Sequence, residues 1–225
     1  MAPCTAQRPA LTRHDRIDYA RGVSSTPSIL SHVTAANSIT STGALLGLAA
    51  VALTLNGLHS AALTCLIGAV LCDRLDGIVA RRLGQSSDFG MQLDSLADAV
   101  SFLVAPAAVV VILSSANPVV AVACAAFVLA GLWRLAHFNV HGMDTGGTES
   151  VFRGLPTTIA GSGFLLVWAG LRLSPIAPHA DWLLAGFLLA MAPLMLSTMP
   201  IRKNGWLIKA LQILALPTLI AAWWV

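Results

Sequence analysis

Half of the chain's ten acidic residues lie in one stretch, residues 73–98. This stretch reads DRLDGIVARRLGQSSDFGMQLDSLAD and lies between two apolar runs, 61–71 and 99–113. Because a charged side chain near a bilayer core is costly, aspartates in such a setting indicate a functional site. Carboxylates grouped with arginines and glycines favour the binding of divalent metal ions and phosphate.

The spacing of four aspartates predicts that their side chains converge. Asp73 and Asp76 are three residues apart, and Asp94 and Asp98 are four apart, so each pair shares one face of a helix. The segment SSD at 86–88 allows the two helices to turn back antiparallel. Four carboxylates then meet, a number that suits two divalent cations with coordination sites open for substrate oxygens.

Small residues lie on the same two faces. Gly77 and Ala80 continue the face of the first aspartate pair, and Gly90 lies one turn before the second pair. These residues leave space for a bulky ligand, such as a nucleotide, to approach the backbone. Arg81 follows Gly77 by one turn and can reach a phosphate or the edge of a base.

Two structural explanations compete for individual aspartates. Asp88 follows two serines and precedes a new helix, and we interpret it as a helix cap. Ion pairs with Arg74 or Arg81 are the second explanation for the aspartates of the first helix. Neither explains why four carboxylates occupy two aligned helical faces.

The composition is that of an integral membrane protein. Hydrophobic residues make up 56% of the 225 residues and charged residues only 10%, against about 25% charged residues in ordinary soluble domains. Long continuous apolar stretches exclude the short alternating strands of an outer-membrane barrel. They predict an all-α bundle of six to seven transmembrane spans. The expected spans are 38–56, 60–80, 92–114, 117–137, 156–173, 182–199 and 205–224.

The positions of lysine and arginine predict the orientation. With a cytoplasmic N-terminus, the outward connections NGLHS, SSANP and LSPIAPHAD carry almost no basic residue, and only Arg172 lies at one of their edges. We therefore expect residues 1–28 to form a basic cytoplasmic tail and residues 29–225 a domain in the inner (cytoplasmic) membrane. Its polar active-site chamber would face the cytoplasm.

An ion-coupled transporter is the alternative from another functional class. Its aspartates would bind a coupling ion or a proton. Such sites lie near the membrane midplane, whereas the basic residues place this cluster at one face. The chain is also short and shows no duplicated halves.

The stretch also resembles the signature of a known family. It reads D-x-x-D-G-x-x-A-R, then eight residues, then G-x-x-x-D-x-x-x-D, which is similar to the CDP-alcohol phosphatidyltransferase pattern at every fixed position. The segments LDSLADAVSF at 93–102, RLAHFNV at 134–140 and FRGLP at 152–156 resemble the bacterial and archaeal phosphatidylserine synthases. The resemblance covers about residues 35–160. Departures include Ala36 in place of a frequent proline and His137 in place of the usual arginine.

The resemblance implies a reaction and a set of site residues. The donor would be CDP-diacylglycerol, the products CMP and a phospholipid, and the cofactors two Mg²⁺ or Mn²⁺ ions. The implied metal ligands are Asp73, Asp76, Asp94 and Asp98. Asp98 would also act as the general base for the acceptor hydroxyl. The implied nucleotide-binding residues are Gly77, Ala80, Arg81, Gly90, Asn37 and Thr40.

The acceptor is less directly indicated, and we expect L-serine. A zwitterion needs a basic partner for its carboxylate, which Arg134 or Arg153 can supply. An anchoring role at the membrane surface fits Arg134 equally well. Phosphate-bearing acceptors, such as glycerol 3-phosphate or inositol phosphate, are the alternative, but they need a denser basic pocket than loop 141–153 offers. The resemblance also implies a homodimer in membrane lipid, and no nucleic-acid partner is expected.

Overall fold

A computed structural model describes residues 28–142, 151–174, 179–197 and 199–202. The chain divides into two units, Met1–Val33 and Thr34–Val225. In the first, the described segment is a short 3₁₀ helix, η1 (Ile29–His32), whose first turn is capped by the Ser28 side chain. The rest of the predicted tail and the predicted span 205–224 lie outside the described residues.

The second unit is built from helices that follow the predicted spans. Two of the α-helices are joined by a π-helix, η2 (Ala99–Val104), into one continuous rod. Each of the first six predicted spans corresponds to one helix or to this rod, with ends shifted by up to four residues. The α-helices are α2 (Ala35–Leu55), α3 (His59–Arg82), α4 (Asp88–Asp98), α5 (Ala105–Leu113), α6 (Pro118–His141), α7 (Thr157–Arg172) and α8 (Ala180–Leu196).

Three helical segments of the described chain are long and apolar enough to cross a membrane: Ala35–Leu55, Asp88–Leu113 and Pro118–His141. Helix α8 is apolar but shorter. Helix α3 has 24 residues, but its second half carries five charged side chains. The protein is therefore an integral membrane protein with a helical fold, and a total of six to seven spans stays a prediction.

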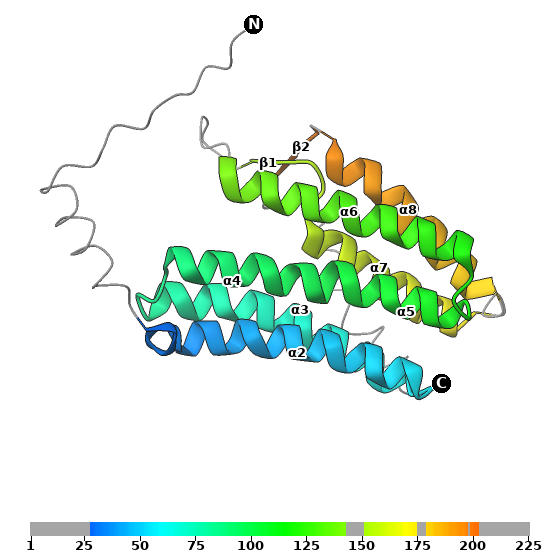
Figure 1. The fold of residues 1–225 in the computed structure, drawn as a ribbon, viewed down its shortest axis with the longest axis horizontal. Helices are drawn as coiled ribbons and strands as arrows, with labels where there is room; N and C mark the ends of the chain where they lie inside the picture. The colour runs from blue at the N-terminus through cyan, green and yellow to red at the C-terminus, as the bar shows by residue number, and fades with distance from the viewer. Residues whose placement is uncertain (1–27, 143–150, 175–178, 198, 203–225) are drawn as a thin grey trace, which may run out of the picture. The chain divides into compact units, whose positions relative to one another are not determined.

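A small sheet accompanies the helices. Strands β1 (Val151–Arg153) and β2 (Pro200–Arg202) pair antiparallel, with Phe152 opposite Ile201 (Figure 1). The expectation of an all-α chain missed this pair. Strands of three residues are too short to show the alternating pattern by which a strand is recognised in a sequence.

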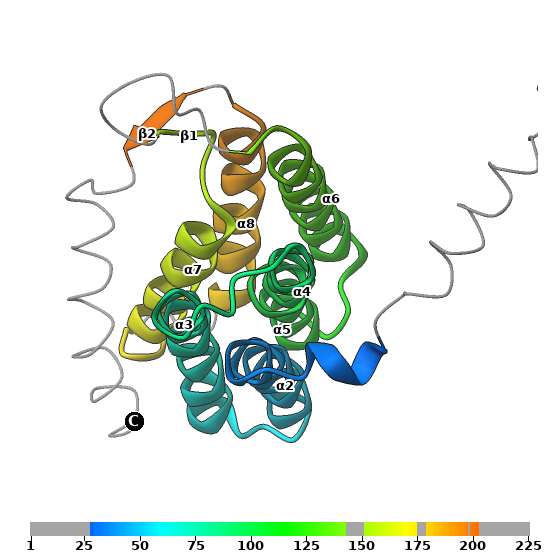
Figure 2. The same cartoon turned by 90° about the vertical axis from the view of Figure 1, so that its left-hand side faces the viewer.

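The α4–η2–α5 rod lies in the middle of the second unit, and the other helices surround it (Figure 2). Glycines allow this close approach at the π-helix. A methyl group added to Gly47 of α2 would lie 3.0 Å from the Ser101 backbone, and one added to Gly161 of α7 would lie 2.7 Å from the Phe102 ring. Small residues let helix backbones approach closely in membranes, so the segment that follows Asp98 is held from two sides.

Candidate active site

Polar residues from several helix ends lie together at one end of the second unit. The start of α2, the end of α3, the start of α4, the end of α6 and the start of α7 lie there. The chain turns from α3 to α4 through Gly84, whose φ of +63° is readily adopted only by glycine. Ser87 then caps α4 by accepting a 3.1 Å hydrogen bond from the Gly90 backbone N–H. The prediction of Asp88 as the helix cap was wrong by one residue, because Asp88 is the first residue of the helix itself.

Three predicted carboxylates meet between α3 and α4. Asp73, Asp94 and Asp98 each offer an oxygen atom, and these oxygens lie within 4.8 Å of one another. The carboxyl groups of Asp73 and Asp98 are within hydrogen-bonding reach of each other. Three carboxylates this close repel one another unless a proton or a cation lies among them. The arrangement therefore favours cation binding.

The fourth predicted carboxylate, Asp76, lies beside this cluster and is 6% exposed. The Thr40 hydroxyl of α2 donates a 2.6 Å hydrogen bond to its Oδ2 atom. A cavity of about 10 Å³, roughly the size that holds one water molecule, is lined by all four aspartates. Arg74 interacts with Asp73 and Arg81 with Asp76, but both arginines are exposed, and neither interacts with Asp94 or Asp98. Ion pairing therefore does not explain the whole cluster.

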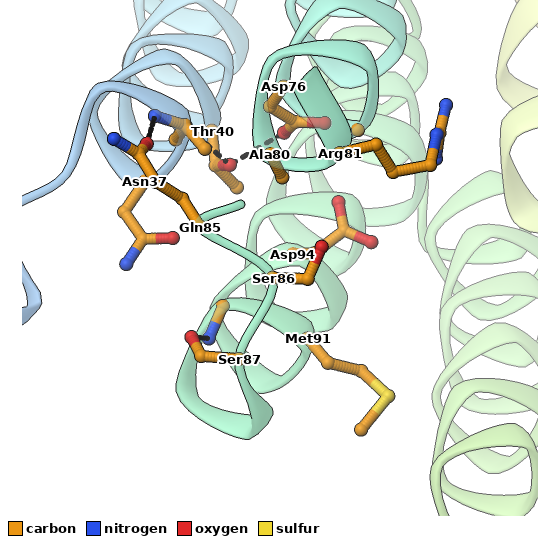
Figure 3. A pocket seen from close by; sticks show the side chains of 13 residues that line it. Asn37, Thr40, Asp76, Ala80, Arg81, Gln85, Ser86, Ser87, Met91 and Asp94 are labelled. Atoms are coloured by element: carbon orange, nitrogen blue, oxygen red, sulfur yellow. Dashed lines mark hydrogen bonds between the residues drawn. The ribbon is translucent and has the colours of Figure 1, made fainter. Parts of the chain in front are cut away.

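A larger cavity of about 210 Å³ adjoins the cluster and shares Asp76 and Asp94 with the small one (Figure 3). It lies among α2, α3, the α3–α4 link and α4. All six residues predicted to bind the nucleotide line it: Asn37, Thr40, Gly77, Ala80, Arg81 and Gly90. The structure thus places the predicted nucleotide residues and the predicted metal ligands in two adjacent spaces.

The glycines of this cavity accommodate polar side chains of the protein itself. A methyl group added to Gly90 would lie 3.1 Å from Oδ1 of Asn37, and one added to Gly77 would lie 3.3 Å from Nη1 of Arg81. From the sequence alone, these glycines were expected to leave space for a ligand. Their immediate effect is to let Asn37 and Arg81 reach the cavity wall.

Several residues of this cavity had not been predicted from the sequence. Gln85 comes from the α3–α4 link, and its Oε1 atom accepts a 3.2 Å hydrogen bond from the Ala36 backbone N–H. This contact ties the link to the start of α2. Gln85 falls within the eight residues that the family pattern leaves unspecified, so no motif pointed to it. Ser86, Ser87 and Met91 line the same cavity.

Arg134 belongs to α6 and interacts electrostatically with Asp98, and only 9% of it is exposed. Its Nη1 atom donates a 3.4 Å hydrogen bond to the hydroxyl of Thr157, which in turn lies 3.3 Å from Oδ2 of Asp98. The Nε atom of Arg134 is buried without a hydrogen-bond partner among the described residues. This burial does not fit an anchor at the membrane surface. Thr157 was not predicted, although a polar residue at the start of an apolar span was visible in the sequence.

The remaining predicted basic residue lies in the sheet. Arg153 belongs to β1 and is in register with Pro200 of β2. His137, which stands where the family usually has arginine, is exposed and stacks on the ring of His141. The structure therefore brings Arg134 next to the carboxylates and gives His137 a different neighbour.

Comparison with known proteins identifies the family. The family model described as CDP-alcohol phosphatidyltransferase matches residues 33–198. The chain belongs to the CDP-alcohol phosphatidyltransferase family. The match spans all helices that contribute to the two cavities and to the Arg134–Thr157–Asp98 contacts.

Several similar proteins have names that mention serine. The CDP-diacylglycerol–serine O-phosphatidyltransferase of Mycobacterium leprae is 34% identical over 163 residues, which are 70% of this chain and 54% of that protein. The enzyme of the same name from Bacillus subtilis is 35% identical over 123 residues, 54% of this chain and 66% of that protein. The archaetidylserine synthase of Methanothermobacter thermautotrophicus is 40% identical over 119 residues, 51% of this chain and 48% of that protein. The chain thus spans about half the length of the first and third relatives.

Members of this family use divalent metal ions, and the carboxylate cluster suits them. Its donors are all carboxylate oxygens, which prefer hard cations such as Mg²⁺, Mn²⁺ and Ca²⁺ over Zn²⁺ or Cu²⁺. The small cavity among the four aspartates also has the dimensions of a single ion or water. The oxygen donors come from two helices and surround one small space. These residues are therefore compatible with the metal requirement of the family.

Proposed function

We propose that this protein transfers the phosphatidyl group of CDP-diacylglycerol to L-serine, with phosphatidylserine and CMP as products. The observation that carries the proposal is the pair of adjacent cavities in a chain of this family. One cavity is lined by carboxylates and the other by the predicted nucleotide residues. The buried Arg134 beside Asp98 favours serine as the acceptor.

The donor fits the site by its chemistry. Its cytidine would occupy the larger cavity, with Arg81 and Asn37 at the wall, and its diphosphate would lie where Asp76 and Asp94 border both cavities. Its acyl chains would stay in the surrounding lipid. A polar chamber at the end of a membrane bundle lets the headgroup bind in polar surroundings while the acyl chains remain in the apolar lipid.

Asp73, Asp76, Asp94 and Asp98 would hold two divalent ions, Mg²⁺ or Mn²⁺. When bound, these ions would neutralise the diphosphate and stabilise the charge that develops on the CMP leaving group. The Thr40 hydroxyl fixes the Asp76 carboxylate toward the start of α2. Such hydrogen bonds from outside the ligand set orient metal-binding groups.

Asp98 is the proposed general base. Its Oδ2 atom accepts the hydrogen bond from Thr157, and its carboxylate would take the proton of the serine hydroxyl. The serine oxygen would attack the phosphorus that bears diacylglycerol, a new P–O bond would form, and the bond to the CMP oxygen would break. The proton would pass to Asp98 and the electron pair to CMP.

Arg134 is the proposed partner of the serine carboxylate. Its unpaired Nε donor is buried, and an unsatisfied buried donor costs about 1–3 kcal/mol. A ligand carboxylate would satisfy this donor and the positive charge together. Arg134 is the one buried arginine among the residues whose burial the structure describes. A single buried cation suits a carboxylate better than a doubly charged phosphate monoester, so serine is favoured over glycerol 3-phosphate and inositol phosphate.

The membrane orientation belongs to the same proposal. The arginines of α3 and the arginine of β1 lie at the sequence positions predicted to face the cytoplasm, at the end of the unit that holds the carboxylates. We therefore propose that the site opens to the cytoplasm, from which water-soluble serine could enter it. A homodimer, implied by the family resemblance, completes the proposal and can be checked by cross-linking in native membranes.

The decisive experiment uses the full chain in detergent with CDP-diacylglycerol, labelled serine and Mn²⁺. We expect labelled phosphatidylserine and an equal amount of CMP. Release of CMP with glycerol 3-phosphate or inositol phosphate, but not with serine, would reject serine as the acceptor. No CMP release with any of these acceptors would reject the enzyme altogether. Ion-dependent solute uptake by proteoliposomes would then support the transporter alternative.

A further inference from the structure

Two histidines lie side by side at the end of α6, apart from the carboxylates. His137 and His141 are four residues apart, so they occupy the same helical face. Their ring centroids are 4.2 Å apart, with an angle of 21° between the ring planes. Both side chains are exposed. Histidines four residues apart on one helical face can bind one ion together, once the stacked rings rotate so that their nitrogen lone pairs converge.

A hydrogen bond prepares one of the rings for metal binding. Nδ1 of His141 lies 3.0 Å from the backbone carbonyl oxygen of His137. When the Nδ1–H group donates to this oxygen, Nε2 of His141 keeps a free lone pair. Metal-bound histidines usually donate their other ring N–H in this way, and the contact fixes both tautomer and ring orientation.

We propose that His137 and His141 form a second metal site, for a transition-metal ion of the Zn²⁺ type. Imidazole nitrogen suits Zn²⁺, Cu²⁺ and Ni²⁺, whereas carboxylate oxygen suits Mg²⁺, Mn²⁺ and Ca²⁺. The two sites of the protein therefore select different ions. The proposal does not depend on the transferase activity, because it rests on the geometry of α6 alone.

Ion binding there has a structural consequence. Between the two histidines lies Asn139, whose Oδ1 accepts a 2.8 Å hydrogen bond from Ser95 and whose Nδ2 donates a 3.1 Å bond to Gln92. Ser95 and Gln92 belong to α4, the helix that carries Asp94 and Asp98. An ion that bridges the histidines would hold the last turn of α6 in helical form and so hold the Asn139 contacts to α4.

The test measures Zn²⁺ binding to the full chain in detergent, by calorimetry, with Mg²⁺ in excess to occupy the carboxylates. We expect one Zn²⁺ per chain. His137→Gln and His141→Gln should each weaken Zn²⁺ binding by about tenfold or more. Loss of a direct ligand should reduce the affinity at least as much as loss of a residue that only hydrogen-bonds to a ligand. His179→Gln is the matched control, because His179 is also exposed but lies outside this pair. It should bind Zn²⁺ as the unchanged protein does.

A second variant tests the helical spacing itself. Val140→His combined with His141→Val keeps the number of histidines but moves one ring about 100° around the helix. Val140 is 78% exposed, so folding should be unaffected. We expect this variant to lose Zn²⁺ affinity as His141→Gln does. The proposal would be overturned if this variant kept its Zn²⁺ affinity or if His141→Gln left the affinity unchanged. It would also be overturned if the original chain bound no Zn²⁺.

Discussion

The Thr157 hydroxyl donates a 3.3 Å hydrogen bond to Oδ2 of Asp98 and so joins the start of α7 to the end of α4. Thr157 is 1% exposed and also receives the hydrogen bond from Arg134. One hydroxyl thus contacts both the proposed base and the proposed carboxylate partner. We infer that Thr157 sets the orientation of both side chains relative to the serine.

Replacement of Thr157 tests this inference. Thr157→Val keeps the shape but removes the hydroxyl, so kcat should fall by about tenfold, equivalent to about 1.4 kcal/mol. Thr157→Ser restores the hydroxyl and should recover most of the activity. Both variants are compared by CMP release at varied serine concentration. If the serine variant is as impaired as the valine variant, Thr157 acts only through packing.

Asp98 is tested by a change that keeps its size. Asp98→Asn removes the proton acceptor, and turnover should fall by about 10²–10⁴-fold, the usual contribution of a general base. Metal-dependent binding of CDP-diacylglycerol should persist, because three other aspartates border the small cavity. Binding is measured with labelled donor and turnover by CMP release.

Asp88→Asn provides the matched control for this change. Asp88 is exposed and lies in the first turn of α4, outside both cavities. Its charge favours the helix N-terminus by about 0.3–1 kcal/mol, so the variant should lose a little stability and keep its turnover. Near-normal turnover in Asp98→Asn would show that another group accepts the proton.

The serine specificity is tested at Arg134. Arg134→Lys keeps a positive charge but cannot form the same paired contacts with a carboxylate. The KM for serine should rise by about tenfold or more, whereas the KM for CDP-diacylglycerol should stay unchanged. Arg172→Lys is the control, because Arg172 lies at the other end of α7 and contacts Ser60. A rise confined to the donor KM would assign Arg134 to the donor instead.

Helical periodicity explains why much of the site was predictable. The spacing of Asp94 and Asp98 on one helix, and the position of Asp73 on the preceding one, are enough to bring three carboxylates together once the helices turn back. The boundaries of the apolar spans were predictable for a similar reason, because each span is a continuous apolar stretch ended by polar residues.

Tertiary contacts were not predictable in this way. Thr157 is 59 positions from Asp98 in the chain, and only the packing of α7 against the central rod brings them together. The choice between Ser87 and Asp88 as the cap was also open, because both residue types cap helices well. Likewise, the sequence showed glycines at 77 and 90 but not which side chains would occupy the space beside them.

A methyl group added to Gly90 would lie 3.1 Å from Oδ1 of Asn37 and 3.3 Å from the Ser87 hydroxyl oxygen. In Gly90→Ala the added methyl group should displace Asn37 from the cavity wall and disturb the cap of α4. Affinity for the donor should fall by about tenfold, which corresponds to about 1.4 kcal/mol. Gly186→Ala in α8 is the control, since nothing lies within 4 Å of its added carbon. Donor binding is measured for both with labelled CDP-diacylglycerol. Equal affinities in the two variants would place the nucleotide away from the Gly90 face and leave the larger cavity without its proposed ligand.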